Sequence, residues 1–556
     1  MNPKTQALEI LSALYDVDTA QQTVERLWSI FPETPENVEP ATPRNDCMLI
    51  TYADSIQAED EIPLQTLGEF LNTHLNICGR VHLLPFYPSS SDDGFAVIDY
   101  RMVDHHVGGW GDIEPLAARY DLMFDLVINH CSRENLWFAD FVGGSEPGRN
   151  FFITLPEESD TSAVARPRST PLISPIHTYA GIRHVWNTFS SDQIDLDFSN
   201  PDVLCEFVAI LMFYIQRGAR LLRLDAIGYL WKRLGTSCLN LPETHLVVKL
   251  LRLLLDEAAP WVRIITETNV PHEENIAYFG AGDEAHLVYQ FSLAPLLLYT
   301  FTFGDSRYLQ RWGQNLDTPP AGATYLNFFA SHDGIGLRPL EGLVPDPDVD
   351  RLVARMHERG GFATLRDSGG QQQRPYEINI SLMSAFGGAD GLPAYLAAHA
   401  LMLSFQGSPA LYIHSFLGTE NDLDLVEQTG RTRSINRRKW QLQDLLHELA
   451  DPTSLRAQTL EAMRELIAVR NSLPALACEA NQTILITEPN AFALRRKSND
   501  QEILVVANIT PQPVKVAAGT LGLDPGTYND HLGDEVTVAK EMELQAYAVC
   551  WLDVPA

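Results

Sequence analysis

The sequence is poor in positive charge. Its 40 lysines and arginines face 72 aspartates and glutamates, for a formal net charge of −32 over 556 residues. So acidic a surface repels nucleic acids and anionic membranes, and we expect neither as a partner. An anionic substrate such as phosphate would be repelled by the overall field and would need a local basic pocket.

Long apolar runs and paired cysteines are also missing. No run reaches the roughly 18 residues that a membrane-spanning helix needs. The seven cysteines are scattered without a C-x-x-C pair, which argues against a zinc site and a disulfide framework. The N-terminal stretch lacks a basic segment followed by an apolar one and is typical of an amphipathic helix, not of a signal peptide. A cytoplasmic location is the resulting expectation.

Eight short apolar stretches alternate with helix-like segments along the chain. They lie at residues 47–54, 80–85, 123–129, 219–225, 262–266, 287–291, 324–329 and 409–414. About four to eight apolar residues between turn-forming residues indicate a buried strand. Strands that alternate with helices indicate parallel βα units, so eight of them predict an α/β fold built on a closed (β/α)8 TIM barrel.

The chain is expected to divide into five parts. These are an N-terminal helical extension (1–45), the barrel (46–130, 200–337 and 391–475), an insertion after the third strand (131–199), a second insertion after the seventh strand (338–390) and a C-terminal part (476–556). Short β-like runs separated by Asn, Pro and Gly predict an antiparallel β domain for the last part. Long insertions on the rim of a barrel usually shape substrate specificity.

Polar side chains gather at the carboxyl ends of the predicted strands. They are Asp54, His130, Asp225, Glu267, His332 and Asp333. In a barrel these ends form one rim, where active sites lie. Arg223 and Asp225 stand two positions apart and so share one face of their strand. A structural ion pair in the core is the alternative interpretation, but the agreement of so many strand ends favours an active site.

Two carboxylates on one rim are the parts of a glycosidase, and in a retaining enzyme they lie about 5–5.5 Å apart. Asp225, beside Arg223, should stay ionised and attack the anomeric carbon. Glu267 follows two isoleucines and could be kept protonated, ready to protonate the leaving oxygen. Further groups on the rim could stabilise the transition state or hold the sugar, namely Asp333, His130 and His332.

Four separated motifs carry a family resemblance. They are D-L-V-I-N-H at 125–130, G-x-x-x-x-R-L-D-A at 218–226, the strand end at Glu267 and H-D at 332–333. In order and spacing they resemble the signature regions of glycoside hydrolase family 13, the α-amylase superfamily. The resemblance implies that Asp225 is the nucleophile, Glu267 the acid/base and Asp333 the transition-state stabiliser. It also implies that the first insertion is domain B and the tail domain C.

A closer resemblance, to the sucrose phosphorylase subfamily, covers nearly the whole chain. It rests on motifs such as L-I-T-Y-A-D at 49–54, V-H-L-L-P-F at 81–86, H-D-G-I-G at 332–336 and I-N-R at 435–437. These enzymes transfer glucose to inorganic phosphate with retention, so the implied partners are a small sugar and phosphate, with no other cofactor. The resemblance implies that the following residues enclose one glucose: Asp92, Phe95, His130, Arg223, Tyr229, His332 and Arg433.

Arginines in the two insertions are candidates for binding phosphate, because the guanidinium fork donates two hydrogen bonds to such an anion. The motifs are R-P-R at 166–168 and R-P-Y-E at 374–377. The resemblance implies that Arg168 and Tyr376 contact phosphate, and Arg166 and Arg374 are further candidates. Ordinary surface arginines are the alternative interpretation.

The acceptor half of the site departs from the sucrose phosphorylases, which have an aromatic residue in place of Ala165, and Asp and Gln in place of Arg374 and Glu377. The local motifs look more like the subfamily's glucosylglycerol and glucosylglycerate phosphorylases. Glu377 could accept hydrogen bonds from a neutral polyol but would repel a carboxylate, whereas Arg374 would favour one. We predict phosphorolysis of 2-O-α-glucosylglycerol. The alternatives are glucosylglycerate or sucrose phosphorylase, and further a family 13 hydrolase or transglucosidase.

No metal is expected. Many amylases bind calcium partly through the residue equivalent to Asn129, but the resembling phosphorylases do not need the ion, and we expect Asn129 to be a structural hydrogen-bonding group. A catalytically dead carbohydrate-binding protein is a competing hypothesis, and the presence of all three carboxylates argues against it. The subfamily contains monomers and dimers, so either a monomer or a homodimer is expected.

Overall fold

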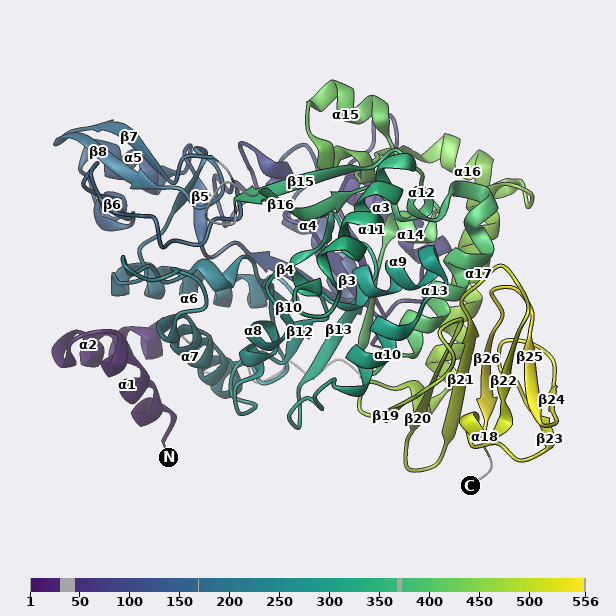
Figure 1. The fold of residues 1–556 in the computed structure, drawn as a ribbon. Helices are drawn as coiled ribbons and strands as arrows, with labels where there is room; N and C mark the ends of the chain where they lie inside the picture. The colour runs from purple at the N-terminus through teal and green to yellow at the C-terminus, as the bar shows by residue number, and fades with distance from the viewer. Residues whose placement is uncertain (1, 31–45, 169, 368–372, 555–556) are drawn as a thin grey trace.

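The computed structural model describes residues 2–30, 46–168, 170–367 and 373–554. Its centre is a closed barrel of parallel strands in the order β1-β17-β13-β12-β11-β10-β4-β3 (Figure 1). All eight predicted strands are present, and the predicted (β/α)8 barrel is confirmed. The strands are β1 (Met48–Thr51), β3 (Arg80–Leu83), β4 (Asp121–Leu126), β10 (Ala219–Leu224), β11 (Arg263–Thr266), β12 (Leu287–Tyr289), β13 (Thr324–Phe328) and β17 (Ser408–Tyr412).

Helices cover the outside of the barrel, which is why its strands are buried on both faces. Helix α6 starts where its sequence predicts, because Asn200 caps the Asp202 N–H and a proline fills the first turn. The helices between the strands are α3 (Pro63–His74), α4 (Trp110–Arg119), α6 (Pro201–Gln216), α7 (Pro242–Ala258), α8 (His272–Ile276), α9 (Leu293–Phe303), α10 (Arg307–Gln314) and α13 (Leu392–Ser404). After β17 come α14 (Ile413–Phe416), α15 (Leu423–Thr429), α16 (Leu442–Ala450) and α17 (Leu455–Ser472), and β2 (Ile56–Gln57) pairs with β18 (Trp440–Gln441).

Two N-terminal helices, α1 (Pro3–Leu14) and α2 (Val17–Ile30), lie against α7 and α6 (Figure 1). The Tyr15 hydroxyl donates a hydrogen bond of 2.8 Å to the carbonyl of Phe198, and Arg26 forms an ion pair of 2.5 Å with Asp202. These contacts fix the helices to the barrel. The Pro-rich segment 31–43, expected to end the extension, lies outside the described residues.

The two insertions leave the barrel at the carboxyl ends of β4 and β13. The first contains α5 (Leu136–Gly143) and two antiparallel sheets, β5-β9 and β6-β8-β7, from β5 (His130–Ser132), β6 (Thr154–Leu155), β7 (Ile173–Thr178), β8 (Gly181–Trp186) and β9 (Gln193–Asp195). The second contains α11 (Asp346–Glu358), α12 (Leu382–Phe386) and the sheet β14-β16-β15, from β14 (Ile335–Gly336), β15 (Phe362–Asp367) and β16 (Gln373–Asn379). Both therefore stand on the same rim of the barrel.

The C-terminal part is antiparallel, as predicted. Its main sheet has the order β19-β20-β21-β26, from β19 (Asn481–Leu485), β20 (Ala491–Lys497), β21 (Glu502–Asn508) and β26 (Val549–Asp553). Two smaller pairs join β22 (Val514–Ala517) to β25 (Glu541–Leu544) and β23 (Gly526–Tyr528) to β24 (Val536–Val538), and α18 (Ala518–Leu521) lies between them in sequence. The buried guanidinium of Arg496 on β20 donates to the carbonyls of Ser404, Ala477 and Ala480. Because Ser404 ends α13, this arginine connects the sheet to the barrel.

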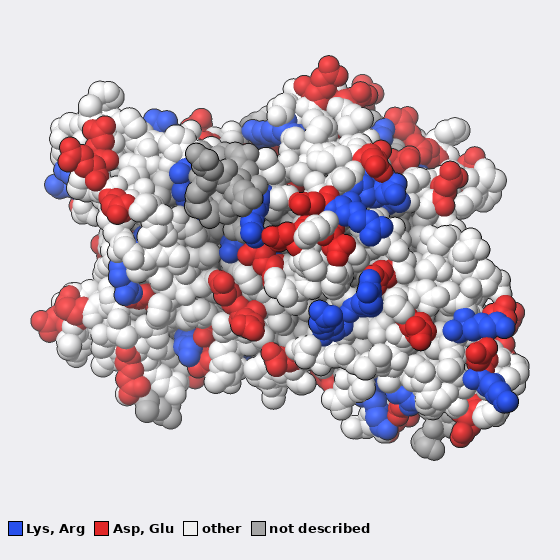
Figure 2. Space-filling view, viewed as in Figure 1, with Lys and Arg blue, Asp and Glu red and all other residues white. Residues whose placement is uncertain are grey.

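The structure agrees with the shortage of positive charge and the lack of long apolar runs in the sequence. Aspartate and glutamate side chains are spread over the face shown in Figure 2, with fewer lysines and arginines among them. Within the described ranges, no helix has both the length and the apolar character needed to cross a membrane.

A buried ammonium group joins the first insertion to the barrel. Lys232 Nζ lies 2.6 Å from Asn129 Oδ1, at the end of β4, and 2.6 Å from Asp195 Oδ2 on β9. The Lys232 side chain is 4% exposed and that of Asp195 is not exposed. Asp195 also accepts hydrogen bonds from the backbone and hydroxyl of Thr188 and from the amide of Asn129. A buried ion pair is tolerated when its remaining hydrogen bonds are satisfied in this way.

We expect Lys232→Ala to destabilise the protein by about 3–5 kcal/mol, because it leaves the buried carboxylate of Asp195 without its counter-charge. Thermal and urea denaturation would measure the loss. Lys515→Ala is the matched control: that side chain is 61% exposed and 3.8 Å from Glu543. It should change stability by no more than about 0.5 kcal/mol. Equal effects of the two substitutions would contradict a special role for Lys232.

Candidate active site

One pocket lies at the carboxyl ends of the barrel strands and between the two insertions. Most of the residues predicted from the strand ends and from the family resemblance converge there. Asp54 does not line the pocket and forms an ion pair with Lys439. Those that line the pocket are Asp92, Phe95, His130, Arg168, Arg223, Asp225, Tyr229, Glu267, His332, Asp333, Tyr376, Glu377 and Arg433. They come from loops far apart in the sequence, so the barrel topology is what brings them together.

Arg223 is the cation at the centre of the pocket floor. Its guanidinium donates to Asp125 on the neighbouring strand β4 and, at 2.7 Å, to Asp225, and it lies 3.9 Å from Glu267. The parallel register aligns Arg223 with Asp125, which explains their contact. Asp125 also contacts His82 Nε2 at 2.7 Å. The sequence analysis quoted Asp125 within a motif but gave it no role, although a charge inside an apolar strand is itself a signal of a buried partner.

Asp225 and Glu267 are two buried carboxyl groups beside the same guanidinium, that of Arg223. Asp225 was expected to stay ionised beside Arg223, and burial opposes its charge. Burial raises the pKa of Asp225 well above its usual value, and Arg223 offsets this only in part because it is shared with Asp125. Burial also raises the pKa of Glu267, which accepts a hydrogen bond of 2.9 Å from the Ala226 N–H. Since Arg223 is closer to Asp225, a single negative charge on the pair is favoured there.

Asp333, which lines the same pocket, is held ionised. Burial opposes its charge, but Arg433 at 2.6 Å holds the pKa of Asp333 well below its usual range. Burial lowers the pKa of the neighbouring His332 to about 3, so its imidazole is neutral near pH 7. The His332 ring stacks on Phe95 with centroids 5.0 Å apart, which fixes its orientation.

The loop after β3 has an unusual backbone. Asp92, Asp93 and Gly94 have φ angles of 55°, 48° and 108°, a left-handed sequence that is uncommon outside glycine. A Cβ atom on Gly94 would lie 2.5 Å from the carbonyl oxygen of Pro85, so only glycine fits there. The loop thus places Asp92 in the pocket and turns Asp93 toward Arg437.

Several side chains that support this loop were missed by the sequence analysis. Arg437 contacts Asp93 and donates a hydrogen bond of 2.8 Å to the carbonyl of His332. Gln193, from the first insertion, donates to Asp92 at 3.2 Å and lies 3.1 Å from His130 Nε2. The two aspartates stand side by side in the sequence, and nothing in it indicates that only one faces the pocket.

Glu377 and Arg433 contact each other. Arg433 Nε and one terminal nitrogen donate to the two carboxylate oxygens of Glu377 at 2.9 and 2.7 Å. Burial opposes ionisation of Glu377, but Arg433 outweighs it and lowers the pKa of Glu377. Arg168 lies farther away, 3.9 Å from the same carboxylate.

Two of the predicted phosphate-binding arginines are not among the residues that line the pocket. Arg166 donates to the carbonyl of Thr170, close to it in sequence. Arg374 lies 3.3 Å from Asp346 and is 47% exposed. These local partners direct both side chains away from the pocket. Of the arginines in the R-P-R and R-P-Y-E motifs, Arg168 is the one that lines the pocket.

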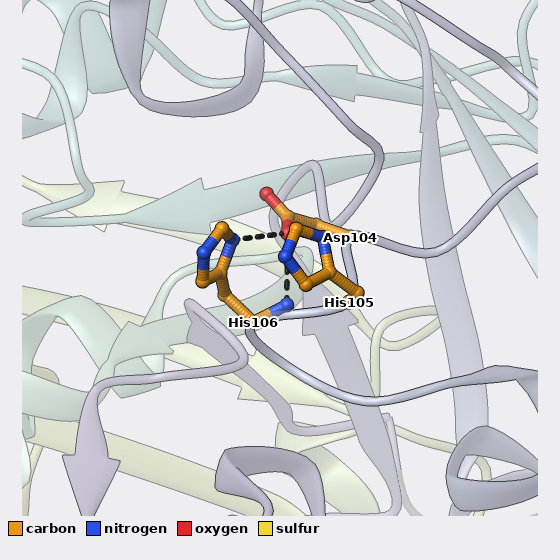
Figure 3. Close-up of side chains that lie close together, drawn as sticks. All are labelled: Asp104, His105 and His106. Atoms are coloured by element: carbon orange, nitrogen blue, oxygen red, sulfur yellow. Dashed lines mark hydrogen bonds and ion pairs between the residues drawn. The ribbon is translucent and has the colours of Figure 1, made fainter.

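Outside the pocket, Asp104, His105 and His106 lie close together after β3 (Figure 3). Their candidate metal-binding atoms all lie within 4.8 Å of one another. Within the described ranges, no other group of three His, Cys, Asp or Glu side chains meets this criterion. Asp104 Oδ1 accepts hydrogen bonds of 2.9 Å from both the backbone N–H and Nδ1 of His106. The carboxylate therefore serves a local turn, and the imidazoles are 85% and 76% exposed. We assign no function to this group.

Comparison with known proteins gives consistent matches. Residues 75–320 match the family model described as "Alpha amylase, catalytic domain". The chain is 43% identical over 529 residues to a glucosylglycerate phosphorylase of Spirochaeta thermophila, covering 92% of this chain and 90% of that protein. It is 30% identical over 446 residues to a glucosylglycerol phosphorylase of Marinobacter adhaerens, covering 78% and 88%. A solved structure of sucrose 6F-phosphate phosphorylase from Thermoanaerobacter thermosaccharolyticum superposes with a TM-score of 0.75 at 25% identity, covering 92% of this chain and 100% of that one.

Proposed function

The chain belongs to the α-amylase family, glycoside hydrolase family 13, and to its retaining glucoside phosphorylases, and on that premise we propose that it cleaves 2-O-α-glucosylglycerate with phosphate. The products are α-glucose 1-phosphate and glycerate. The sequence analysis preferred glycerol as the leaving group. Its glycerate alternative fits the relatives better, since the glucosylglycerate phosphorylase is 43% identical and the glucosylglycerol phosphorylase 30% identical.

The charged groups around Glu377 are the structural observation that supports glycerate as the leaving group. The argument for a neutral polyol treated this carboxylate as an isolated charge that would repel an acid. In the structure the carboxylate is held by the two-bonded guanidinium of Arg433, which also pairs with Asp333, and Arg168 is a second cation 3.9 Å away. Arg168 lines the pocket with its nearest ion-pair contact at 3.9 Å, so its guanidinium can receive the carboxylate of glycerate in one half of the reaction and phosphate in the other.

The carboxylates supply the chemistry of a double displacement. Asp225 attacks the anomeric carbon, and Glu267 gives its proton to the glycerate oxygen as that bond breaks. Phosphate then attacks the glucosyl–Asp225 ester and releases α-glucose 1-phosphate with the original stereochemistry. Arg223 lies 2.7 Å from Asp225 and 3.9 Å from Glu267, and Asp333, which lines the same pocket, stabilises the positive charge that develops on the sugar.

The synthetic direction tests the acceptor. The enzyme would be given α-glucose 1-phosphate with D-glycerate, glycerol or fructose in parallel, and phosphate release would be followed. We expect release with D-glycerate well above the other two, and a loss of at least roughly 10³-fold in Asp225→Asn. Preference for glycerol or fructose would move the assignment to that phosphorylase. Release equal to a control without acceptor would indicate a hydrolase.

The pH dependence tests the two carboxylate roles. Glu267 must be protonated and burial raises its pKa, so kcat/KM for glucosylglycerate should fall as pH rises through that pKa. Asp225 must be ionised and burial raises its pKa too, so activity should also fall on the acidic side. Glu267→Gln should still release fluoride from α-glucosyl fluoride, whose leaving group needs no acid, and the alkaline limb should disappear. Persistence of that limb would assign the proton donor to another group.

With α-glucosyl fluoride as donor, which carries no phosphate, Arg168→Gln should lower kcat/KM for D-glycerate and for phosphate as acceptors by roughly 10- to 100-fold, the effect of losing a charged hydrogen-bond donor. Transfer to neutral glycerol from the same donor should stay unchanged. Arg374→Gln is the matched control, because that side chain is 47% exposed and paired with Asp346. A glycerate defect in Arg374→Gln but not in Arg168→Gln would restore the original expectation for Arg374.

A further inference from the structure

Glu377 occupies a fixed position in the second insertion, on the wall of the pocket. It lies on β16, the middle strand of its sheet, where it pairs with Gly336 of β14 and Thr364 of β15. Its side chain is 2% exposed. A residue whose backbone is paired on both sides and whose side chain is buried has little freedom to follow a substrate that enters and leaves.

Both carboxylate oxygens of Glu377 accept hydrogen bonds from one edge of the Arg433 guanidinium. Nε donates to Oε1 at 2.9 Å and a terminal nitrogen donates to Oε2 at 2.7 Å. The other terminal nitrogen lies 2.6 Å from Asp333 Oδ1. Because the guanidinium group is planar and rigid, holding one edge in a forked pair sets the direction of the third nitrogen.

From this geometry we infer that Glu377 is a positioning residue that aims Arg433 at Asp333, and that it acts on transfer of the glucosyl group rather than by contacting the acceptor. The inference rests on the proposed retaining mechanism. It revises the sequence-based expectation that Glu377 binds the acceptor. It also explains why a site proposed to bind an anionic acceptor contains a carboxylate. Asp333 is the group through which the effect reaches the reaction.

Hydrolysis of α-glucosyl fluoride separates the two roles, because it needs no acceptor. In Glu377→Gln we expect kcat/KM for fluoride release to fall roughly 10- to 100-fold, since a charged, two-bonded partner is lost. When D-glycerate is added, the ratio of transfer to hydrolysis depends only on how the glucosyl-enzyme divides between glycerate and water. That ratio should stay within about twofold of wild type. An acceptor ligand would behave in the opposite way, with normal fluoride release and a reduced ratio, and that result would overturn the inference.

Two further variants keep the test independent of folding. Glu358→Gln, in α11 of the same insertion with a side chain 64% exposed, should match wild type in both measurements and in melting temperature. Arg433→Lys keeps the charge but loses the fork, so adding Glu377→Gln to it should cost little more. Full additivity of the two substitutions would overturn the coupling. Wild-type protein that released no fluoride would refute the retaining mechanism and this inference together, whereas an unchanged Glu377→Gln would refute the inference alone.

Discussion

The buried guanidinium of Arg223 is the interaction on which the site depends. A cation that is 3% exposed inside a barrel is tolerated only if acids surround it, and Asp125 and Asp225 do so from β4 and from the end of β10. A slip of one residue in either strand would turn these side chains to the other face and leave the charges unpaired. The requirement that the buried cation be paired is therefore the same one that fixes Asp225 and brings Glu267 within 3.9 Å of the shared cation.

The same pairing of opposite charges continues outward from the floor of the pocket. Asp333, Arg433, Glu377 and Arg168 follow one another with alternating sign, at 2.6, 2.7 and 3.9 Å. The contacts lengthen toward Arg168, the cation that we propose receives glycerate and phosphate in turn. Tight pairing suits groups that must not move during the reaction, and looser pairing suits the cation that receives the exchanged ligand. A protein with a formal charge of −32 thus offers a local cation to anionic substrates.

The barrel and its carboxylates could be predicted from the sequence because both depend on local patterns. Each strand is a short apolar run, and the position of an acid directly after a strand places it on the rim once the number of strands is known. Asp225 and Glu267 follow directly after β10 and β11, and Asp333 lies in the loop after β13. The family motifs selected these three acids, whereas Asp54, also near a strand end, does not line the pocket.

The partners of charged side chains could not be predicted, because they come from distant parts of the chain. Arg437 and Asp93 are separated by 344 residues, and Arg433, which contacts Glu377 of the second insertion, comes from the chain after β17. The preference for a glycerol acceptor rested on the charge of Glu377, and the sequence does not show that Arg433 holds this carboxylate. Arg166 and Arg374 illustrate the same limit, since motif position does not reveal that a nearby carbonyl or carboxylate captures the side chain.

The ammonium group of Lys232 has a consequence for how the pocket wall responds to its surroundings. When a cation from solution bridges two acidic or polar groups, the stability that it adds depends on its concentration and is lost on dilution. Here the cation that joins Asn129 to Asp195 is part of the polypeptide, so its effective concentration at the junction is set by the fold alone. The first insertion carries Arg168 into the site. The stability that Lys232 gives to its attachment therefore does not depend on the concentration of any bound cation.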